Sequence, residues 1–399
     1  MMRKTELIQR TQIQRTQTPI LLALLTFLLL ASSALGQADI PAADAFPARL
    51  TGEFKSAIVI DAATGLTLIS NEENLRRPPA SMLKMMTELI VLEHIAEGDM
   101  TMDEIVKVSA KASNMGGSQV YLKHGEEFRV EELLMALAIH SANDAAVALA
   151  EHLAGSTDAF IDQMNIKARD LGMTNTEFHT VHGLPPAWKQ KSDMTTARDM
   201  ATLARVLVKH PRALEWASTK TAPFRDGKFT LYNPNKLVGN YRGLDGLKTG
   251  YTGAAGFCVT ATAIQKGKRL ISVVMGCPTD KGRATETTRM LSFGFNMYKQ
   301  VPVFADAGKP LAEPLRIKGG KKKSVLVTYG ESLEVSVPRN REQDLELEIR
   351  LPEEFQAPVA AGAEVGQAVI KLDGIVLGSV PIVATEAVEK GNWFNRLMN

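Results

Sequence analysis

The sequence predicts a mixed α/β or α+β domain followed by a small all-β domain. Strand patterns come first, long helical patterns fill the middle, and strand patterns return near residues 256–275. After about residue 302 no further helical pattern occurs until the last dozen residues, and short apolar segments alternate with turn residues instead. We therefore expect the mixed domain over residues 39–302 and the all-β domain over residues 303–385.

The composition is that of an ordinary globular protein. The chain has 399 residues, of which 45% are hydrophobic and 23% charged, with 46 Lys and Arg against 44 Asp and Glu. The near-neutral balance provides no field to hold a polyanion, so nucleic acid is not an expected partner. Two cysteines cannot form a four-ligand zinc site, and the seven histidines lack metal-ligand spacing. Neither a metal nor another cofactor is expected.

Residues 1–38 are typical of a secretory signal peptide. A basic start precedes the apolar run Ile20–Leu30, and small residues follow up to Ala38. The apolar run is shorter than the roughly 20 residues that a membrane-spanning helix needs. We expect cleavage near Gly36 or Ala38 and export to the periplasmic side of the inner membrane or to the cell-wall space. An uncleaved anchor is the alternative.

The mixed domain reads, in chain order, as a hairpin, several helices, two strands and a closing helix. Residues 57–60 and 66–69 flank a Gly-containing turn, which predicts the hairpin. Two helical patterns follow Pro79, the second of which ends at Gly155. The segments are helix 80–96, helix 130–154, a helix after 192–196 that ends near 209, strands 256–263 and 269–275, and helix 283–298.

The second domain consists of short strand patterns without helices. Residues 345–351 alternate Leu and Ile with charged residues, which indicates one buried face and one exposed face. Residues 386–399 form a separate tail, in which Trp393, Phe394, Leu397 and Met398 share one helical face. This tail is expected either to associate with a membrane surface as an amphipathic helix, or to be a terminus that packs on the β domain or on nothing.

The segment Ser81–Lys84 places a hydroxyl and an amine three residues apart at a helix start. A serine attacks a carbonyl only when a base removes its proton, and a lysine can be that base once burial lowers its pKa. Apolar neighbours make this burial plausible. Alone, the pattern is equally that of an ordinary amphipathic helix.

The segment Ser141–Asn143 interrupts a strongly apolar helical pattern. Buried polar groups require partners, so these residues either cap a broken helix or face a site.

The segment Lys248–Gly250 lies in a glycine-rich strand pattern. Glycine lets a ligand approach a strand edge, and lysine with threonine suits an anionic substrate. Its alternative interpretation is a turn with one solvated lysine.

Together the three segments form the combination S-x-x-K, S-x-N and K-T-G, which is characteristic of penicillin-binding proteins and class A β-lactamases. The chain closely resembles the D-alanyl-D-alanine carboxypeptidases, the low-molecular-mass penicillin-binding proteins of bacteria, over about residues 40–300. The segments that carry the resemblance are 79–87, 141–145, 182–184, 196–201 and 246–250. It implies a transpeptidase-like domain with an antiparallel sheet and a helical subdomain.

The resemblance also implies roles for individual residues. Ser81 would attack the carbonyl between two terminal D-alanines of a peptidoglycan stem peptide, and Lys84 would take its proton. Ser141 would return a proton to the leaving D-alanine, and Asn143 would orient the substrate. Substrate binding would fall to Lys248, Thr249, Gly250, Tyr251 and Arg283, with the Ser81 and Tyr251 amides as the oxyanion hole. β-Lactam antibiotics would acylate Ser81.

Two positions depart from the pattern of many relatives. Ala142 stands where Gly or Asp is common, and Tyr251 stands where some relatives have His. Only the amide of Tyr251 is needed. Arg283 has the alternative interpretation of a helix-start residue that pairs with Glu286.

Rival functions share the same motifs. A class A β-lactamase would need an E-x-x-L-N loop, and the segment at Glu177 does not match one. A D,D-endopeptidase, a penicillin-binding sensor that stays acylated and a wall-binding module without turnover remain open at this level.

Cys258 and Cys277 lie on the two strands joined by a short turn. Export would permit a disulfide between them, but a register offset of two residues would prevent it.

Overall fold

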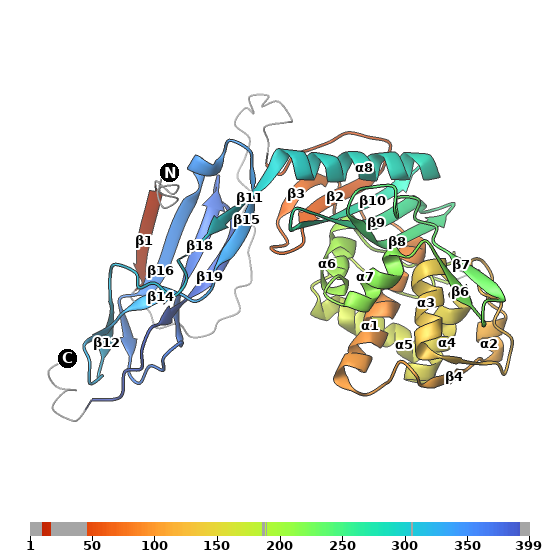
Figure 1. The fold of residues 1–399 in the computed structure, drawn as a ribbon, viewed down its shortest axis with the longest axis horizontal. Coiled ribbons are helices and arrows are strands. Elements are labelled where there is room, and N and C mark those ends of the chain that lie inside the picture. Colours follow the sequence, from red (N-terminus) through yellow and green to blue (C-terminus); the bar gives the residue numbers. More distant parts are fainter. Residues whose placement is uncertain (1–9, 17–45, 186–187, 189, 305, 392–399) are drawn as a thin grey trace. The chain divides into compact units, whose positions relative to one another are not determined.

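The computed structural model describes residues 10–16, 46–185, 188, 190–304 and 306–391. The chain divides into two compact units, a smaller one of residues 1–39 and 297–399 and a larger one of residues 40–296. Both units are shown in Figure 1. Among the described helices, none has both the length and the apolar character that crossing a membrane requires.

A five-stranded antiparallel sheet forms the framework of the larger unit. Its strand order is β3-β2-β10-β9-β8, and all neighbouring strands are antiparallel. The predicted antiparallel sheet is therefore confirmed. The strands are β2 (Ser56–Asp61), β3 (Thr67–Asn71), β8 (Leu244–Thr252), β9 (Gly256–Gln265) and β10 (Lys268–Cys277). In the β2–β3 hairpin, which was also predicted, Asp61 Oδ1 accepts the amides of Ala63 and Thr64 at 2.9 and 3.2 Å.

Helices lie on both faces of this sheet (Figure 1). Helix α8 (Asp280–Met297) covers one face, where a Cβ added to Gly294 would lie 2.8 Å from the Leu270 side chain. The helical subdomain covers the other face. Its helices are η1 (Ala80–Leu83), α1 (Lys84–Glu97), α2 (Ala110–Ser113), α3 (Val130–His140), α4 (Asn143–Ala154), α5 (Thr157–Asp170), α6 (Ala197–Leu207) and α7 (Pro211–Ser218). Two short antiparallel strand pairs accompany them: β4 (Ile105–Lys107) pairs with β5 (Glu127–Arg129), and β6 (Thr221–Phe224) pairs with β7 (Phe229–Tyr232).

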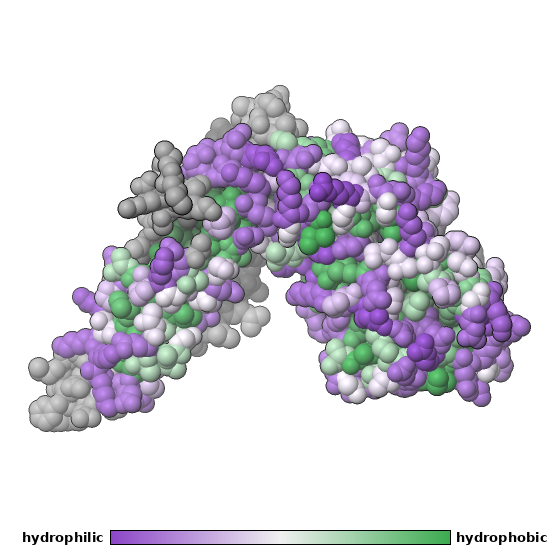
Figure 2. Space-filling model, in the orientation of Figure 1, coloured by the Kyte–Doolittle hydropathy of each residue, from purple (hydrophilic) through white to green (hydrophobic). Residues whose placement is uncertain are grey.

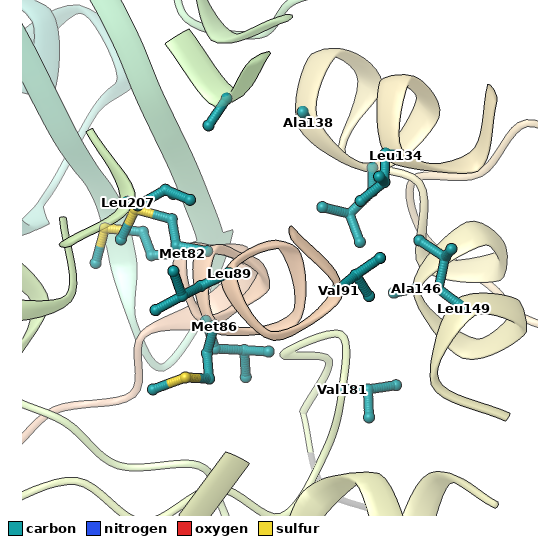
Figure 3. Close-up of a cluster of buried hydrophobic side chains, with 14 of the residues drawn as sticks. Met82, Met86, Leu89, Val91, Leu134, Ala138, Ala146, Leu149, Val181 and Leu207 are labelled. Carbon is teal, nitrogen blue, oxygen red and sulfur yellow. The ribbon is translucent and has the colours of Figure 1, made fainter. Parts of the chain in front are cut away.

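Helix α1 runs through the centre of the main hydrophobic core. In Figure 3, Val91 points towards Leu134 of α3 and Leu149 of α4, while Met86 and Leu89 lie on other sides of the helix. Because α1 is enclosed on most sides, its residues from 84 to 92 are all buried. Burial of this kind stabilises the fold by about 1.5–3 kcal/mol for each large apolar side chain. Polar residues on such a helix must therefore have a specific reason to be there.

The described part of the smaller unit consists of strands and a short 3₁₀ turn, and the predicted all-β domain is confirmed. Its largest sheet has the order β1-β16-β18-β19-β14. Two small sheets pair β11 with β15, and β12 with both β13 and β17. The elements are β1 (Arg10–Thr16), β11 (Tyr298–Val303), β12 (Leu315–Lys318), β13 (Ser324–Val325), β14 (Val327–Tyr329), β15 (Leu333–Pro338), η2 (Glu342–Asp344), β16 (Glu346–Pro352), β17 (Glu354–Gln356), β18 (Glu364–Leu372) and β19 (Ile375–Ala384).

The predicted alternation in residues 345–351 holds for the apolar residues but not for Glu348. Leu347, Ile349 and Leu351 are buried, as expected. Glu348 is also buried, because it forms ion pairs with Arg350 and with Lys371 on the neighbouring strand. Glu348 lies on the same face of the strand as Arg350, opposite the apolar residues, so the alternation of faces is kept although the charged face is partly covered.

Both predicted terminal segments lie largely outside the described residues. Of residues 1–38, the structure describes Arg10–Thr16, which pair as β1 in parallel with β16. The apolar run and the cleavage positions lie outside. Of the tail, the structure describes residues up to Gly391, with Val388 bridged to Val359. The four residues of the predicted amphipathic face lie outside.

Candidate active site

Ser81 and Lys84 lie at the junction between η1 and α1. The first turn, expected to be α-helical, is a 3₁₀ turn, and the α-helix begins at Lys84 itself. The Lys84 Nζ atom lies 2.8 Å from the Ser81 Oγ atom. Ser81 is partly exposed, whereas the Lys84 side chain is completely buried. The pair is therefore accessible from the serine side only.

The environment of Lys84 favours its neutral amine. Burial is the main cause, and it holds the pKa of Lys84 well below its usual range. The positive charge of Lys248 lowers this pKa further, while Asp144 and Asp193 act in the opposite direction. Lys84 also donates a hydrogen bond to the His182 carbonyl oxygen at 2.7 Å. A neutral amine held in this way can direct its lone pair at the serine hydroxyl.

The loop of residues 179–183 is the support behind Lys84. The Asp193 carboxylate accepts the His179 and Thr180 amides at 2.6 and 2.9 Å, and the Thr180 hydroxyl at 2.7 Å. Gly183 has a φ of +80°, and a Cβ there would lie 2.2 Å from the Ala80 carbonyl oxygen. Sequence reasoning gave none of these residues a role. The histidine-containing motif was visible, but the backbone carbonyl of His182 makes the contact.

The segment at Ser141 breaks the helical pattern of residues 130–154 into two helices. Ser141 has a left-handed φ of 66°, so α3 ends at His140 and α4 begins at Asn143. A single helix over residues 130–154 is therefore not formed, and the alternative interpretation, a helix broken at these polar residues, is confirmed. The side-chain nitrogen of Asn143, Nδ2, donates to the Gly116 carbonyl oxygen at 2.7 Å. Its Oδ1 atom is buried without a hydrogen-bond partner among the described residues.

Strand β8 is an edge strand of the sheet and lies beside the serine. A Cβ added to Gly250 would lie 2.7 Å from the Pro79 carbonyl oxygen and 3.1 Å from the Ser81 amide nitrogen. Lys248 and Thr249 are buried, with 2% and 6% exposure, while Tyr251 is 57% exposed. The Tyr251 ring stacks on Phe257, with centroids 4.2 Å apart. The structure thus brings β8 to the residue pair on η1 and α1.

Arg283 lies at the start of α8, under strand β9. Its guanidinium donates to the Cys258 carbonyl oxygen at 3.1 Å and pairs with Asp280. The alternative pairing with Glu286 is wrong, since Glu286 pairs with Arg289 instead. In the sheet register Cys258 is opposite Gly250, so Arg283 contributes positive charge behind the edge strand.

Comparison with known proteins identifies the family. Residues 44–279 match the model of the D-alanyl-D-alanine carboxypeptidase peptidase family, and residues 298–390 match that of the penicillin-binding protein 5 C-terminal domain. This chain belongs to the D-alanyl-D-alanine carboxypeptidase family. The predicted enzyme class, a serine-type carboxypeptidase, and the predicted fold are both confirmed.

Individual members of the D-alanyl-D-alanine carboxypeptidase family align over most of the chain. DacF of Bacillus subtilis is 38% identical over 352 residues, which are 87% of this chain and 89% of the relative. DacC of Escherichia coli is 35% identical, covering 88% of this chain and 90% of the relative. Penicillin-binding protein 5 of Haemophilus influenzae superposes with a TM-score of 0.76 at 29% identity, covering 86% of this chain and 99% of that structure.

The two cysteines of this carboxypeptidase are free and buried. Cys277 is opposite Phe257 in the register, so Cys258 is not its partner. Among the described residues, one group has the spacing of metal ligands, namely His94, Glu97 and Asp99 at the end of α1. None of its members contacts Ser81 or Lys84 among the interactions of the described residues, and its carboxylates are exposed.

Proposed function

We propose that this carboxypeptidase removes the terminal D-alanine from peptidoglycan stem pentapeptides through an acyl-enzyme at Ser81. The observation that carries the proposal is the 2.8 Å contact between the buried Lys84 amine and the Ser81 hydroxyl. A serine with such a neighbour can act as a nucleophile without a histidine. β-Lactams, whose strained amide resembles the scissile bond, acylate the same hydroxyl.

Acylation begins when Lys84 takes the proton of Ser81 as the hydroxyl oxygen attacks the carbonyl carbon. The neutral state of Lys84, favoured by its burial, is the state that can accept this proton. The backbone amides of Ser81 and Tyr251 stabilise the negative charge that develops on the carbonyl oxygen. The close approach of Gly250 to the Ser81 amide supports this assignment, because Tyr251 is the next residue along the strand.

Departure of D-alanine requires a proton on its nitrogen. Ser141, at the corner between α3 and α4, passes this proton to the leaving group. Asn143 orients the substrate amide, and its unpartnered buried Oδ1 atom supports that role because a substrate N–H would satisfy it. A water molecule then hydrolyses the acyl-enzyme and releases the shortened peptide.

The terminal carboxylate of the substrate binds at β8. Thr249 offers a hydroxyl, Lys248 and Arg283 supply positive charge, and Gly250 lets the strand lie close to the Ser81 backbone. The burial of both cations supports this role, since charges removed from water attract an anion more strongly.

We further propose that the signal peptide directs export and that the enzyme works on the periplasmic side of the inner membrane or in the cell-wall space. The amphipathic pattern of residues 386–399 supports contact with a membrane surface. Fractionation of cells that carry the full chain, or a form ending before Val388, tests this. Equal membrane association of the two forms would contradict a role for the tail.

The proposed activity is tested by measuring three reactions with one preparation of the protein. Carboxypeptidase activity releases D-alanine from a pentapeptide, endopeptidase activity cleaves a cross-linked dimer, and β-lactamase activity turns over nitrocefin. We expect D-alanine release to dominate. Rapid nitrocefin turnover without D-alanine would identify a β-lactamase, dimer cleavage without D-alanine would identify an endopeptidase, and stoichiometric acylation without any turnover would identify a sensor.

A further inference from the structure

Glu88 is a buried carboxyl group that the proposed mechanism does not use. It lies on α1, one helical turn after Lys84, and is only 4% exposed. Its Oε1 atom is buried and has no hydrogen-bond partner among the described residues. A buried carboxyl group without a hydrogen-bond partner costs free energy, which a nearby positive charge can offset.

The charged group near Glu88 is Lys248 of β8. Helix α1 packs against β8, and Lys248 and Glu88 each act on the pKa of the other. The Lys248 Nζ atom contacts the carbonyl of the adjacent Thr249 at 3.3 Å. Both side chains are buried on neighbouring elements, and no hydrogen bond or ion pair between them occurs among the interactions of the described residues.

The other charged groups around α1 have partners other than Lys248. Lys167 of α5 pairs with Glu93 at 2.7 Å, and the Asp199 carboxylate on α6 accepts the Thr176 hydroxyl at 2.7 Å. From α4 and from the loop behind Lys84, Asp144 and Asp193 act on Lys84.

Besides Glu88, three groups act on Lys248 or respond to it, and one of them is Lys84, whose pKa Lys248 lowers. Arg283 of α8 lowers the pKa of Lys248, and the pKa of His140 on α3 is lowered by burial and by Lys248. Glu88 is therefore the group that favours the charged form of Lys248.

We propose that Glu88 is a positioning residue that keeps Lys248 in its ammonium form when the carboxylate of the substrate binds at β8. The inference rests on the proposed function, because it gives Lys248 its role there. Glu88 does not touch the substrate; it acts through Lys248. Two buried groups of opposite sign can hold one proton between them, which an arriving anion draws onto the lysine. The proton then leaves the Glu88 carboxyl and binds the Lys248 amine, so the net charge of the pair does not change.

The pKa values of Glu88 and Lys248 determine the direction in which the activity profile should move along the pH axis. Burial raises the pKa of Glu88 to about 8, and burial lowers the pKa of Lys248 to about 7. Around neutral pH the pair therefore retains one proton. Without the carboxyl group, Lys248 would lose its proton at lower pH, because the group that raises its pKa is gone. Binding of an anionic substrate would then fail at a lower pH than in the wild type.

The experiment compares pH profiles of kcat/KM for D-alanine release from a peptide that ends in D-Ala-D-Ala. In Glu88→Gln we expect the alkaline limb of the profile to move to lower pH by about one unit. Glu88→Asp, which keeps a carboxylate, should lie between the two profiles. Glu93→Gln is the matched control, because it removes a carboxylate from the same helix away from Lys248, and its profile should be that of the wild type.

Two outcomes would overturn the inference while the wild type remains active. One is an unchanged alkaline limb in Glu88→Gln, and the other is an equal loss of activity at every pH, which would indicate a packing role. If the Gln variant does not fold, Glu88→Met carries the same prediction with an apolar side chain of similar length. Absence of D-alanine release by the wild type would instead contradict the proposed function.

Discussion

Gly250 lies against the backbone of Ser81 with no room for a side chain. A Cβ on Gly250 would be 3.1 Å from the Ser81 amide nitrogen and 2.7 Å from the Pro79 carbonyl oxygen. Because both obstacles are backbone atoms, β8 and η1 would have to move apart to accept it. The spacing between the edge strand and the serine therefore depends on this glycine.

The first prediction follows from that spacing. Gly250→Ala should slow acylation by benzylpenicillin by about 100-fold, because a displacement near 1 Å at a reacting centre has an effect of that size. Stopped-flow acylation measures it. Gly253→Ala is the control, since a Cβ at Gly253 meets nothing within 4 Å. Equal rates for the two variants would mean that the strand does not set the geometry.

We expect the buried Lys84 amine to lower the free energy of unfolding, although activity requires it. Its depressed pKa means that folding opposes protonation of the amine. The resulting loss of folding stability is absent above the usual lysine pKa and grows as the pH falls below that value. Lys84→Met should abolish acylation and yet raise the free energy of unfolding at pH 7 by about 1 kcal/mol or more. Urea unfolding at pH 7 and near pH 10.5 tests this, and the gain should shrink at the higher pH. A variant less stable than the wild type at pH 7 would contradict the account.

Asp193 should influence the pH at which Lys84 is active. Its charge raises the pKa of Lys84, so Asp193→Asn should move the acid limb of the acylation profile to lower pH. The variant should also lose about 1–3 kcal/mol of stability, because an NH2 group replaces the oxygen that accepts the Thr180 hydroxyl and the remaining bonds to the loop amides lose the assistance of the charge.

Asp199→Asn separates the two effects of the Asp193 change. Asp199 is a buried carboxylate that holds the Asn175 amide at 3.0 Å and the Thr176 hydroxyl at 2.7 Å. Its removal should lower stability but leave the acid limb in place. A similar displacement of the limb in both variants would refute the specific role of Asp193.

The two cysteines should behave as inert buried thiols. Burial raises the pKa of Cys277 to about 12 and also raises that of Cys258, so few thiolates form at neutral pH. Iodoacetamide at pH 7.5 should modify neither in the native protein and both in urea, as read by intact mass. A mass difference of two hydrogens on reduction would instead reveal a disulfide.

The order of elements and the three motifs could be predicted from the sequence because they depend on local patterns. Turn residues and β-branched runs gave the β2–β3 hairpin, and Gly155 gave the end of α4. The S-x-x-K segment placed Ser81 and Lys84 one turn apart, and this spacing survives although the turn is 3₁₀. Family resemblance supplied the association of the three segments.

The remaining features depend on contacts between distant parts of the chain. A helical pattern cannot show that Ser141 adopts a left-handed conformation, because Ser and Asn within a helix are compatible with continuation. Lys84 donates to the backbone carbonyl of His182, and because every residue has such a carbonyl, the residue type at position 182 does not indicate the contact. Glu88 looks like an ordinary helix residue until the packing around α1 shows that it is buried.

The most direct test of the central claim, that Ser81 is the nucleophile, is peptide mapping by mass spectrometry after incubation with benzylpenicillin. The account predicts one covalent adduct, located on Ser81, and its complete loss in Ser81→Ala with unchanged thermal unfolding. An adduct on another residue, or one that persists in Ser81→Ala, would contradict it.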